Sequence, residues 1–426
     1  MLTPEQIAKI RQKDASLTEA HRRDSLTNYY EGYFFVTLNT RCEAPILSFV
    51  AGHVGASGPD APHCEYTELG RGVIAGWNRM PSVCPYARVI ACEAMPDHFH
   101  GLLQLLPGNK RHLGSLMSGF MSGCTHAYWD VLGINWRHDQ FGAYAQKMPD
   151  RDRDHTRSFR GPALFVRGYN DVVPITAEEV QIKIDYIRKQ AEKRLIQGEC
   201  HNCFAIHRDQ HSQNWKWERV LNALLSDRQL ANSETRREEA VRNVLSRLAT
   251  DNDGTIQTVA VTDKRTLLGP AMGRAEVARE AVAVDGLSLS YLGNRTILAS
   301  GKKLPLVCHR ADASRFEEQK CAVLDKARDG WVVVSAFISP KEREIRNQLM
   351  TEQLPFVEIM DNGFSERYKP MGKAFYACAE QRLVQISCWG YMYQRDEKIS
   401  REFCLVMNEL ARLVSGGPDD WWKKKE

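Results

Sequence analysis

The first half of the chain is organised around Met95-Pro96-Asp97-His98-Phe99-His100-Gly101-Leu102-Leu103. An apolar segment at residues 87–94 precedes it, and a second runs from His98 to Leu105. Both segments are typical of β-strands. Because successive side chains of a strand point to opposite faces of a sheet, we expect His98 and His100 to share one face while Phe99 packs on the other. The stretch therefore predicts two imidazoles side by side on a rigid strand, which is part of a metal site with open positions.

A second stretch, Tyr186-Ile187-Arg188-Lys189-Gln190, lies downstream in a segment with helical spacing. Residues four apart on a helix are neighbours. Tyr186 and Gln190 can therefore face the same metal ion, one as a nucleophile and the other as a ligand. Tyr169 is an alternative nucleophile, although it lies in turn-like sequence and has no such partner four residues on.

The two stretches, in this order, resemble the His-hydrophobic-His and Tyr-x-x-x-Gln motifs of the single-tyrosine HUH transposases of the REP-associated and small insertion-sequence type. The resemblance implies an α+β domain over residues 29–200, with an antiparallel sheet covered by helices. It also implies metal-dependent cleavage and rejoining of single-stranded or hairpin DNA through a phosphotyrosine. In that family the tyrosine is the nucleophile, and Mg²⁺ or Mn²⁺ is bound by the two histidines and the carboxamide. Here these residues are Tyr186, His98, His100 and Gln190. Active members are often dimers, so a homodimer is one alternative for this chain.

Basic residues surround the expected nucleophile. Lysine and arginine side chains neutralise the DNA backbone, which a phosphodiester-cleaving site has to bind. We therefore expect DNA contacts from Lys183, Arg188, Lys189, Lys193 and Arg194. Thr176 and Glu179 form the Thr-x-x-Glu pattern of a capping box, which predicts where the helix carrying these residues begins.

The second half of the chain has a different pattern. Apolar runs typical of strands recur at residues 287–292, 304–308, 331–335, 356–360 and 383–386. Helical segments separate the last four runs, and a final helix is expected at residues 400–413. Strands that alternate with helices indicate βαβ units and a mostly parallel sheet. We predict an α/β domain over residues 286–415, preceded by a helical connector at 201–285 and followed by a disordered tail at 416–426.

This second domain resembles the Rossmann-like domain of the DNA-processing A (Smf) proteins in Tyr291-Leu292-Gly293-Asn294, in Cys308-His309-Arg310 with Ser314, and in Val333-Val334-Ser335-Ala336. Those proteins have a Gly-Ser-Arg turn where this chain has Cys308-His309-Arg310. Glycine at such a turn lets backbone amides approach a phosphate. Without it, Arg310 and Ser314 are the candidate anion-binding residues. A general doubly wound scaffold that acts in assembly is the alternative.

A cluster of metal-ligand types lies between the two halves, at Cys200, Cys203, His207 and His211. The residue types suit a structural zinc, but the gap from Cys203 to His207 is much shorter than in a zinc finger. A zinc site and a polar connector are both open interpretations.

The composition of the 426 residues is that of a soluble globular protein of two or more domains, with 43% hydrophobic and 26% charged residues. The net charge of +4 permits nucleic-acid binding without arguing for it. No apolar run reaches membrane-spanning length, and the 12 scattered cysteines favour reduced thiols and a cytoplasmic location. We expect residues 1–28 to form a polar arm. Two other functions stay open: a domesticated DNA-binding protein with a vestigial nuclease site, and a nucleotide-sensing regulatory protein.

Overall fold

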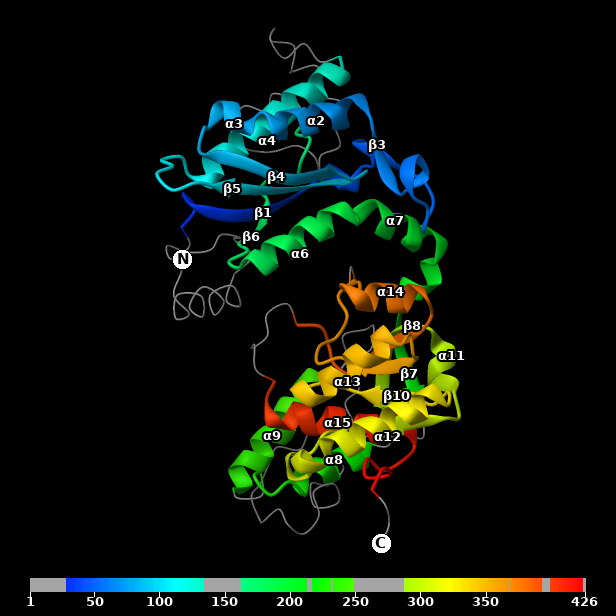
Figure 1. Cartoon of the computed structure of the whole chain (residues 1–426). Helices are drawn as coiled ribbons and strands as arrows, with labels where there is room; N and C mark the ends of the chain where they lie inside the picture. The colour runs from blue at the N-terminus through cyan, green and yellow to red at the C-terminus, as the bar shows by residue number, and fades with distance from the viewer. Residues whose placement is uncertain are drawn as a thin grey trace. The chain divides into compact units, whose positions relative to one another are not determined.

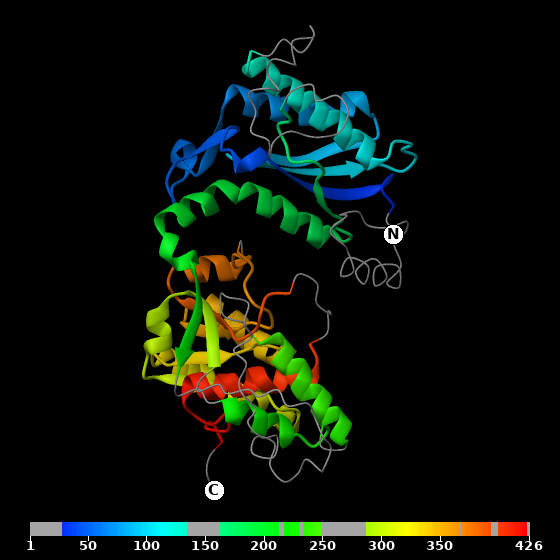
Figure 2. The same cartoon turned by 180° about the vertical axis from the view of Figure 1, so that it is seen from behind.

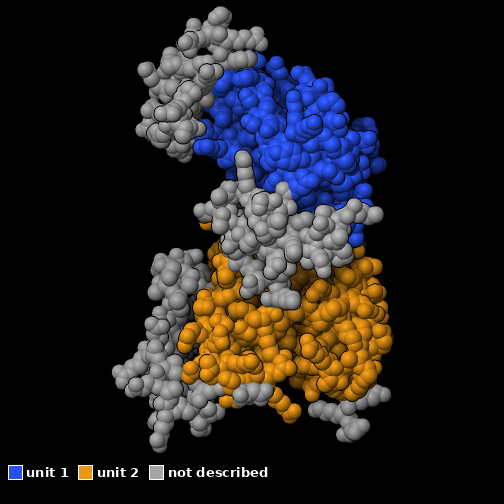
Figure 3. All heavy atoms as spheres, turned by 90° about the vertical axis from the view of Figure 1, so that its left-hand side faces the viewer, with its two compact units in different colours: residues 1–199 blue, residues 200–426 orange. Residues whose placement is uncertain are grey.

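The computed structural model describes residues 28–133, 162–212, 217–230, 233–248, 287–366, 368–392 and 399–423. The chain divides into two compact units, residues 1–199 and residues 200–426, which Figure 3 shows in different colours. Unit 1 contains antiparallel sheets and unit 2 a mostly parallel sheet, so the predicted mixture of sheet types is confirmed. The expected arm, apart from residue 28, lies outside the described residues, as do residues 249–286 of the expected connector.

The main sheet of unit 1 has the strand order β4-β5-β1-β6. Its strands are β1 (Gly32–Asn39), β4 (Ala87–Ala94), β5 (His98–Leu105) and β6 (Asn170–Val172). Neighbouring strands are antiparallel throughout. A separate pair of antiparallel strands comprises β2 (Ser48–Ala51) and β3 (His63–Tyr66). The strand with the two histidines is thus an inner strand, hydrogen-bonded on both sides.

Helices cover both faces of this sheet. Helices α2 (Glu68–Asn78) and α4 (Leu113–Val131) lie on one face, and α3 (Met80–Val83) follows α2 (Figure 1). Helix α6 (Ala177–Arg188) crosses the opposite face and continues into α7 (Gln190–Glu199) (Figures 1 and 2). The unit therefore has two layers of packing, one on each side of β5.

The larger core of unit 1 lies between the sheet and helices α2 and α4. The rings of Trp77 and Phe99 pack with a centroid distance of 5.1 Å, and Phe120 of α4 completes the cluster. Gly101 follows in β5, and a Cβ at this position would overlap the Trp77 ring. The glycine of the histidine stretch thus allows the buried tryptophan to approach the strand.

Helix α6 begins where the capping-box pattern predicts. The Thr176 hydroxyl accepts a hydrogen bond from the Glu179 amide at 3.1 Å, and the Glu179 carboxylate accepts one from the Thr176 amide. Ile187, on the side of α6 that faces the sheet, packs against Phe35 and Leu102. The alternation along β5 therefore buries Leu102 beneath α6 and Phe99 in the opposite core.

Unit 2 contains a six-stranded sheet with the order β7-β8-β12-β11-β10-β9. Its strands are β7 (Ile206–Ser212), β8 (Leu287–Gly293), β9 (Lys303–Pro305), β10 (Val332–Ser335), β11 (Phe356–Ile359) and β12 (Leu383–Ser387). Strands β9 to β12 are parallel, whereas β8 pairs antiparallel with β12 and β7 with β8. The predicted parallel arrangement therefore holds for four strands, and an antiparallel pair extends one edge.

Each face of this sheet has its own helices. One core contains α12 (Phe316–Arg328), α13 (Pro340–Thr351) and α14 (Lys373–Ala379). The other contains α8 (Trp217–Leu225), α9 (Glu234–Arg247), α11 (Arg295–Ala299) and α15 (Arg401–Ser415). The described residues of the expected connector thus supply β7, α8 and α9 to unit 2 itself. Within the described ranges, no helix has the length and apolar character needed to cross a membrane.

The expectation of a disordered tail is wrong for its described residues, which reach position 423. Trp422 is buried, and the indole of Trp421 donates a 3.0 Å hydrogen bond to the carbonyl of Pro305. Lys423 forms a 2.8 Å ion pair with Asp312. Burial of Trp422 and the hydrogen bond of Trp421 offset the cost in conformational entropy of ordering this polar segment.

Candidate active site

His98 and His100 lie on the same face of β5, with their ring centroids 4.6 Å apart. His100 is buried, with 4% of its surface exposed. Thr37 lies directly opposite His100 on β1, and its hydroxyl oxygen is 3.0 Å from His100 Nδ1. Pairing on both sides of β5 therefore holds the two imidazoles in place, as the alternation in the sequence predicts.

Tyr186 lies above these histidines, in the last turn of α6. Its ring centroid is 5.3 Å from that of His100 and 5.7 Å from that of Phe35, both in edge-to-face geometry. The tyrosine is 36% exposed, so the protein covers its side chain only in part. The structure thus brings the predicted nucleophile and the predicted histidine ligands together within one chain.

Gln190 lies at the break between two helices, because α6 ends at Arg188 and α7 begins at Gln190. Its carboxamide nitrogen donates a 3.1 Å hydrogen bond to the backbone carbonyl of Tyr186. That bond uses a donor and leaves the carboxamide oxygen available as a ligand. Burial raises the pKa of the Tyr186 phenol, and a hydrogen bond with the Gln190 side chain opposes this shift.

Asp97 connects the histidine strand to α7. One carboxylate oxygen lies 2.6 Å from His98 Nδ1, and the other lies 3.2 Å from the Arg194 guanidinium. The hydrogen bond to His98 is the main cause of the lowered pKa of Asp97, and Arg194 adds to it. An imidazole that donates through Nδ1 presents the lone pair of Nε2, which is how metal-binding histidines are commonly oriented.

The residues present fit a divalent metal ion of the type the resemblance implies. Burial lowers the pKa of His100 well below its ordinary value, and the nearby His98 and Lys183 add to the effect. This keeps the imidazole neutral, which is the form that binds metals. Among the described residues no three His, Cys, Asp or Glu side chains are grouped to hold a metal. The resemblance implies Gln190 as the third protein ligand. Two imidazoles with one carboxamide favour Mn²⁺ or a later metal over Mg²⁺.

Three of the five predicted DNA-contacting residues lie at this site. The Lys183 ammonium is 4.9 Å from the centroid of the Phe35 ring, and the Lys193 ammonium is 5.0 Å from that of Tyr186. Arg194 is held by Asp97. The other two, Arg188 and Lys189, are exposed where α6 meets α7.

Tyr169, the alternative nucleophile, is not brought to the histidines. It packs against the core beneath α2 and α4, together with Phe99 and Phe120. That core lies on the face of the sheet opposite His98 and His100. Of the two candidate tyrosines, only Tyr186 can therefore reach them.

Two of the candidate zinc ligands, Cys200 and Cys203, have neighbouring side chains in unit 2. The Cys200 thiol donates to the carbonyl of Ala379 at 3.7 Å, while the His207 ring stacks on Tyr291 with a centroid distance of 4.6 Å. No metal-binding group forms around them among the described residues, which do not include the His211 side chain. The zinc interpretation therefore gains no support from this structure.

Only one of the two candidate anion-binding residues of unit 2 lines a cavity. Both lie in the short 3-10 helix at Arg310–Arg315, but only Arg310 lines the cavity at the end of β9, and Ser314 does not.

No family model matches the chain, and no curated protein matches it. Among solved structures, the chain is similar to a REP-associated tyrosine transposase bound to a REP hairpin. The TM-score is 0.25 and the sequence identity 13%, over 42% of this chain and 74% of that one. It is also similar to a candidate transposase from Deinococcus radiodurans R1, with a TM-score of 0.22 and 13% identity, over 40% of this chain and 98% of that one. At these values the functional argument rests on the residues and their geometry.

Two residues of the site were not assigned a role from the sequence. Thr37 could not be predicted as part of the site, because its position opposite His100 depends on which strands pair and in which register. Asp97 directly precedes His98, so its place in the sequence could have indicated a contact with that histidine. Its ion pair with Arg194 could not be predicted, because the two residues are far apart in the chain.

Proposed function

We propose that unit 1 cleaves and rejoins single-stranded DNA through a covalent bond to Tyr186, as an HUH-type transposase domain. The observation that carries this proposal is the convergence of three predicted groups on one face of the sheet. The His98 and His100 rings are 4.6 Å apart, and the Tyr186 ring is 5.3 Å from His100. A pair of neighbouring histidines alone would have a purely structural explanation, but an adjacent tyrosine with a carboxamide beside it suits phosphoryl transfer.

The reaction would proceed by attack of the Tyr186 phenol oxygen on a backbone phosphorus. The new oxygen–phosphorus bond gives a phosphotyrosine, the bond to the 3′ oxygen breaks, and that oxygen takes up a proton to leave as a 3′ hydroxyl. Reversal of these steps rejoins the strand without a nucleotide cofactor, because the covalent bond conserves the energy of the phosphodiester. A divalent metal on His98, His100 and Gln190 would supply Lewis-acid polarisation of the phosphate when bound.

The phenol needs help to lose its proton. An unperturbed tyrosine has a pKa of about 10, and burial raises that of Tyr186 further. The Lys193 ammonium above its ring provides a positive charge that favours the phenolate as it forms. Lys183 and Arg194 would bind the phosphates on either side. The similar transposase of known structure is bound to a REP hairpin, which makes hairpin DNA a natural substrate to test.

The test is covalent capture. The full chain is incubated with labelled single-stranded or hairpin DNA and Mn²⁺, and adducts that survive denaturing electrophoresis are measured. We expect an adduct with the wild type, none with Tyr186→Phe, and an unchanged yield with Tyr169→Phe, which removes the same hydroxyl from the opposite core. An adduct that persists in Tyr186→Phe would contradict the proposal. Retention of hairpin binding without any adduct would instead favour the domesticated DNA-binding protein.

A further inference from the structure

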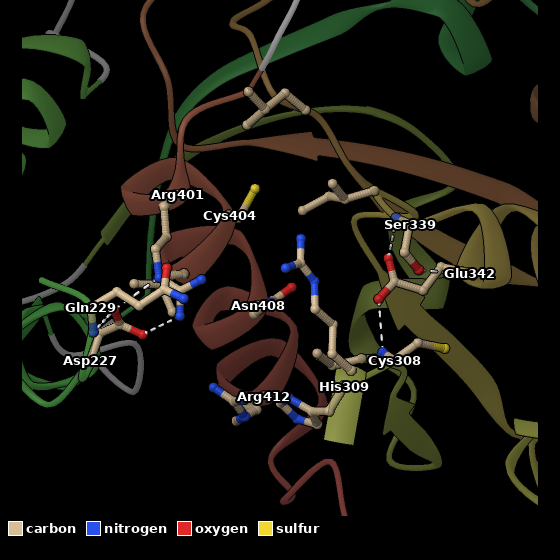
Figure 4. Close-up of a pocket in the computed structure, with 15 residues that line it drawn as sticks. Asp227, Gln229, Cys308, His309, Ser339, Glu342, Arg401, Cys404, Asn408 and Arg412 are labelled. Carbon is tan, nitrogen blue, oxygen red and sulfur yellow. Dashed lines mark hydrogen bonds and ion pairs between the residues drawn. The ribbon is translucent and has the colours of Figure 1, made fainter. Parts of the chain in front are cut away.

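Unit 2 contains a cavity of about 710 Å³ at the carboxyl ends of two parallel strands. Cys308, His309 and Arg310 follow β9, and Ser339 follows β10 at the start of α13. Helix α15 supplies another wall through Cys404 and Asn408 (Figure 4). The carboxyl ends of parallel strands are where open α/β sheets bind ligands, and this volume suits a small organic molecule.

The backbone amides at this position are already occupied by a carboxylate of the chain itself. Glu342 accepts a 2.8 Å hydrogen bond from the Cys308 amide and a 3.0 Å bond from the Ser339 amide (Figure 4). Its side chain is buried, at 3% exposed. In glycine-rich phosphate loops, amides of this kind hold the phosphate. Because Glu342 uses them here, an anionic ligand has to be recognised by a side chain instead.

Arg310 is the side chain available for that purpose. Arg401 is committed to Asp227 through two hydrogen bonds of 2.8 and 2.6 Å. Arg412 is committed to two carboxylates outside the cavity lining, at 2.8 and 2.9 Å. Among the described residues, no hydrogen-bond or ion-pair partner is found for Arg310, although it lines the same cavity. A guanidinium in this state is suited to bind one phosphate through two parallel hydrogen bonds.

The other residues that line the cavity suit a flat, partly polar chemical group rather than a second anion. Val307, Ile338 and Leu405 provide apolar walls. Asn408 and Gln229 add carboxamides whose side chains have no hydrogen-bond partner within the described part of the chain. Carboxamides present a donor and an acceptor side by side, which matches the edge of a nucleobase. Figure 4 shows Gln229 and Asp227 at the end of the cavity opposite Ser339 and Glu342.

We propose that this cavity binds a nucleoside monophosphate, with its phosphate on Arg310 and its base between the apolar walls and the carboxamides of Asn408 and Gln229. This site lies within unit 2 and does not depend on the function proposed for unit 1. It differs from sites built on a glycine-rich turn because the phosphate is recognised by an arginine side chain and the amides are filled by Glu342.

The test is calorimetric titration of the full chain with AMP, GMP, CMP and UMP separately, with inorganic phosphate and a short oligothymidylate as comparison ligands. We expect at least one mononucleotide to bind more tightly than inorganic phosphate. Arg310→Ala should weaken that binding about tenfold or more, since a charge-assisted bidentate contact is lost. The matched control is Arg295→Ala, which removes an exposed arginine of α11 outside the cavity. Asn408→Ala should change the preference among the four bases.

Several results would overturn the proposal. Absence of binding by all four mononucleotides would do so, and so would equal effects of Arg310→Ala and Arg295→Ala. Binding of the oligothymidylate alone would show that the cavity serves a polynucleotide instead. Circular dichroism of each variant checks that a loss of binding does not come from misfolding.

Discussion

Among the single residues of the candidate site, Asp97 links the strand that carries the histidines to the helices that carry Tyr186 and Gln190. Its carboxylate contacts His98 of β5 on one side and Arg194 of α7 on the other. One side chain thus orients an imidazole and ties the strand to the helix pair that carries Tyr186 and Gln190. Charge-assisted hydrogen bonds of this type are stronger than neutral ones and more specific in geometry.

We predict that Asp97→Asn weakens Mn²⁺ binding by about 10- to 100-fold, which is typical for loss of a carboxylate that orients a metal-binding histidine. The amide can still occupy the space but does not stabilise the same imidazole orientation. Isothermal titration with Mn²⁺ measures the change, and adduct formation should decline with it. Glu178→Gln is the control, because that carboxylate lies exposed in the first turn of α6. Unchanged Mn²⁺ affinity in Asp97→Asn would show that His98 does not bind the metal in the proposed orientation.

A second prediction concerns His309, whose Nε2 lies 2.7 Å from Asp419. The hydrogen bond to Asp419 raises the pKa of His309. Because the folded-state pKa is above the unfolded value of about 6.5, the stabilisation is fully present below that pH and is lost as the pH rises through the raised pKa. The His309 side chain is 45% exposed, so screening limits the effect to about 0.5 kcal/mol.

Urea unfolding of wild type and His309→Gln checks this prediction. The wild type should exceed the variant in free energy of unfolding at about pH 6, and the difference should shrink by about pH 9. Asn347→Gln, at an exposed residue that does not titrate, should show no such trend. A difference that stays the same at both pH values would mean that the pair does not contribute through protonation.

At the scale of elements, β5 serves two layers at once. Its histidines face α6, while Phe99 and Gly101 face the core that contains Trp77. The strand is positioned by close packing on one face, and this fixes the imidazoles on the other. Substitutions in this core should therefore first lower the free energy of unfolding.

We predict that Gly101→Ala destabilises the protein by about 1–3 kcal/mol, the usual cost of overpacking a core. The added methyl group would overlap the Trp77 ring, which is fully buried and has no room to move. Urea unfolding measures the change. In the control, Gly119→Ala in α4, the new methyl group meets nothing within 4 Å and should instead stabilise the helix by about 0.5–1 kcal/mol. Equal stability of Gly101→Ala and wild type would show that Trp77 does not constrain this strand.

At the scale of the whole molecule, each unit has its own core and its own candidate site. Tyr186, His100 and Gln190 all belong to unit 1 of a single chain, with the tyrosine and histidine rings 5.3 Å apart. A site completed within one chain does not need a residue from a second copy, even if the protein is a dimer.

We therefore predict that two inactive variants do not complement each other. A mixture of Tyr186→Phe and His98→Ala chains, co-expressed in the same cells, should give no covalent DNA adduct. Each chain then lacks one essential group of its own site. The readout is the denaturing-gel assay described above, and co-expressed wild-type and Tyr186→Phe chains are the positive control. Recovery of adduct in the variant mixture would show that the tyrosine of one chain completes a site with the histidines of another chain.

The elements on which the site is built follow largely from local sequence patterns. The alternation in β5 and the capping box of α6 are relations between neighbours along the chain, so local geometry was enough to predict them. The single helix expected to carry both Tyr186 and Gln190 is instead interrupted at Lys189, between α6 and α7. The alternation of strands and helices likewise predicted the parallel part of the second sheet.

Contacts between segments far apart in the chain do not follow from such patterns and depend on how the chain folds. Local sequence does not say which face of the sheet α6 crosses, and this choice brings Tyr186 to His100 and leaves Tyr169 in the opposite core. The burial of Trp422 and the hydrogen bond from the Cys308 amide to Glu342 are also contacts between distant segments. In each case the free energy comes from packing or hydrogen bonding between groups that meet only after the chain has folded, so no local pattern records them.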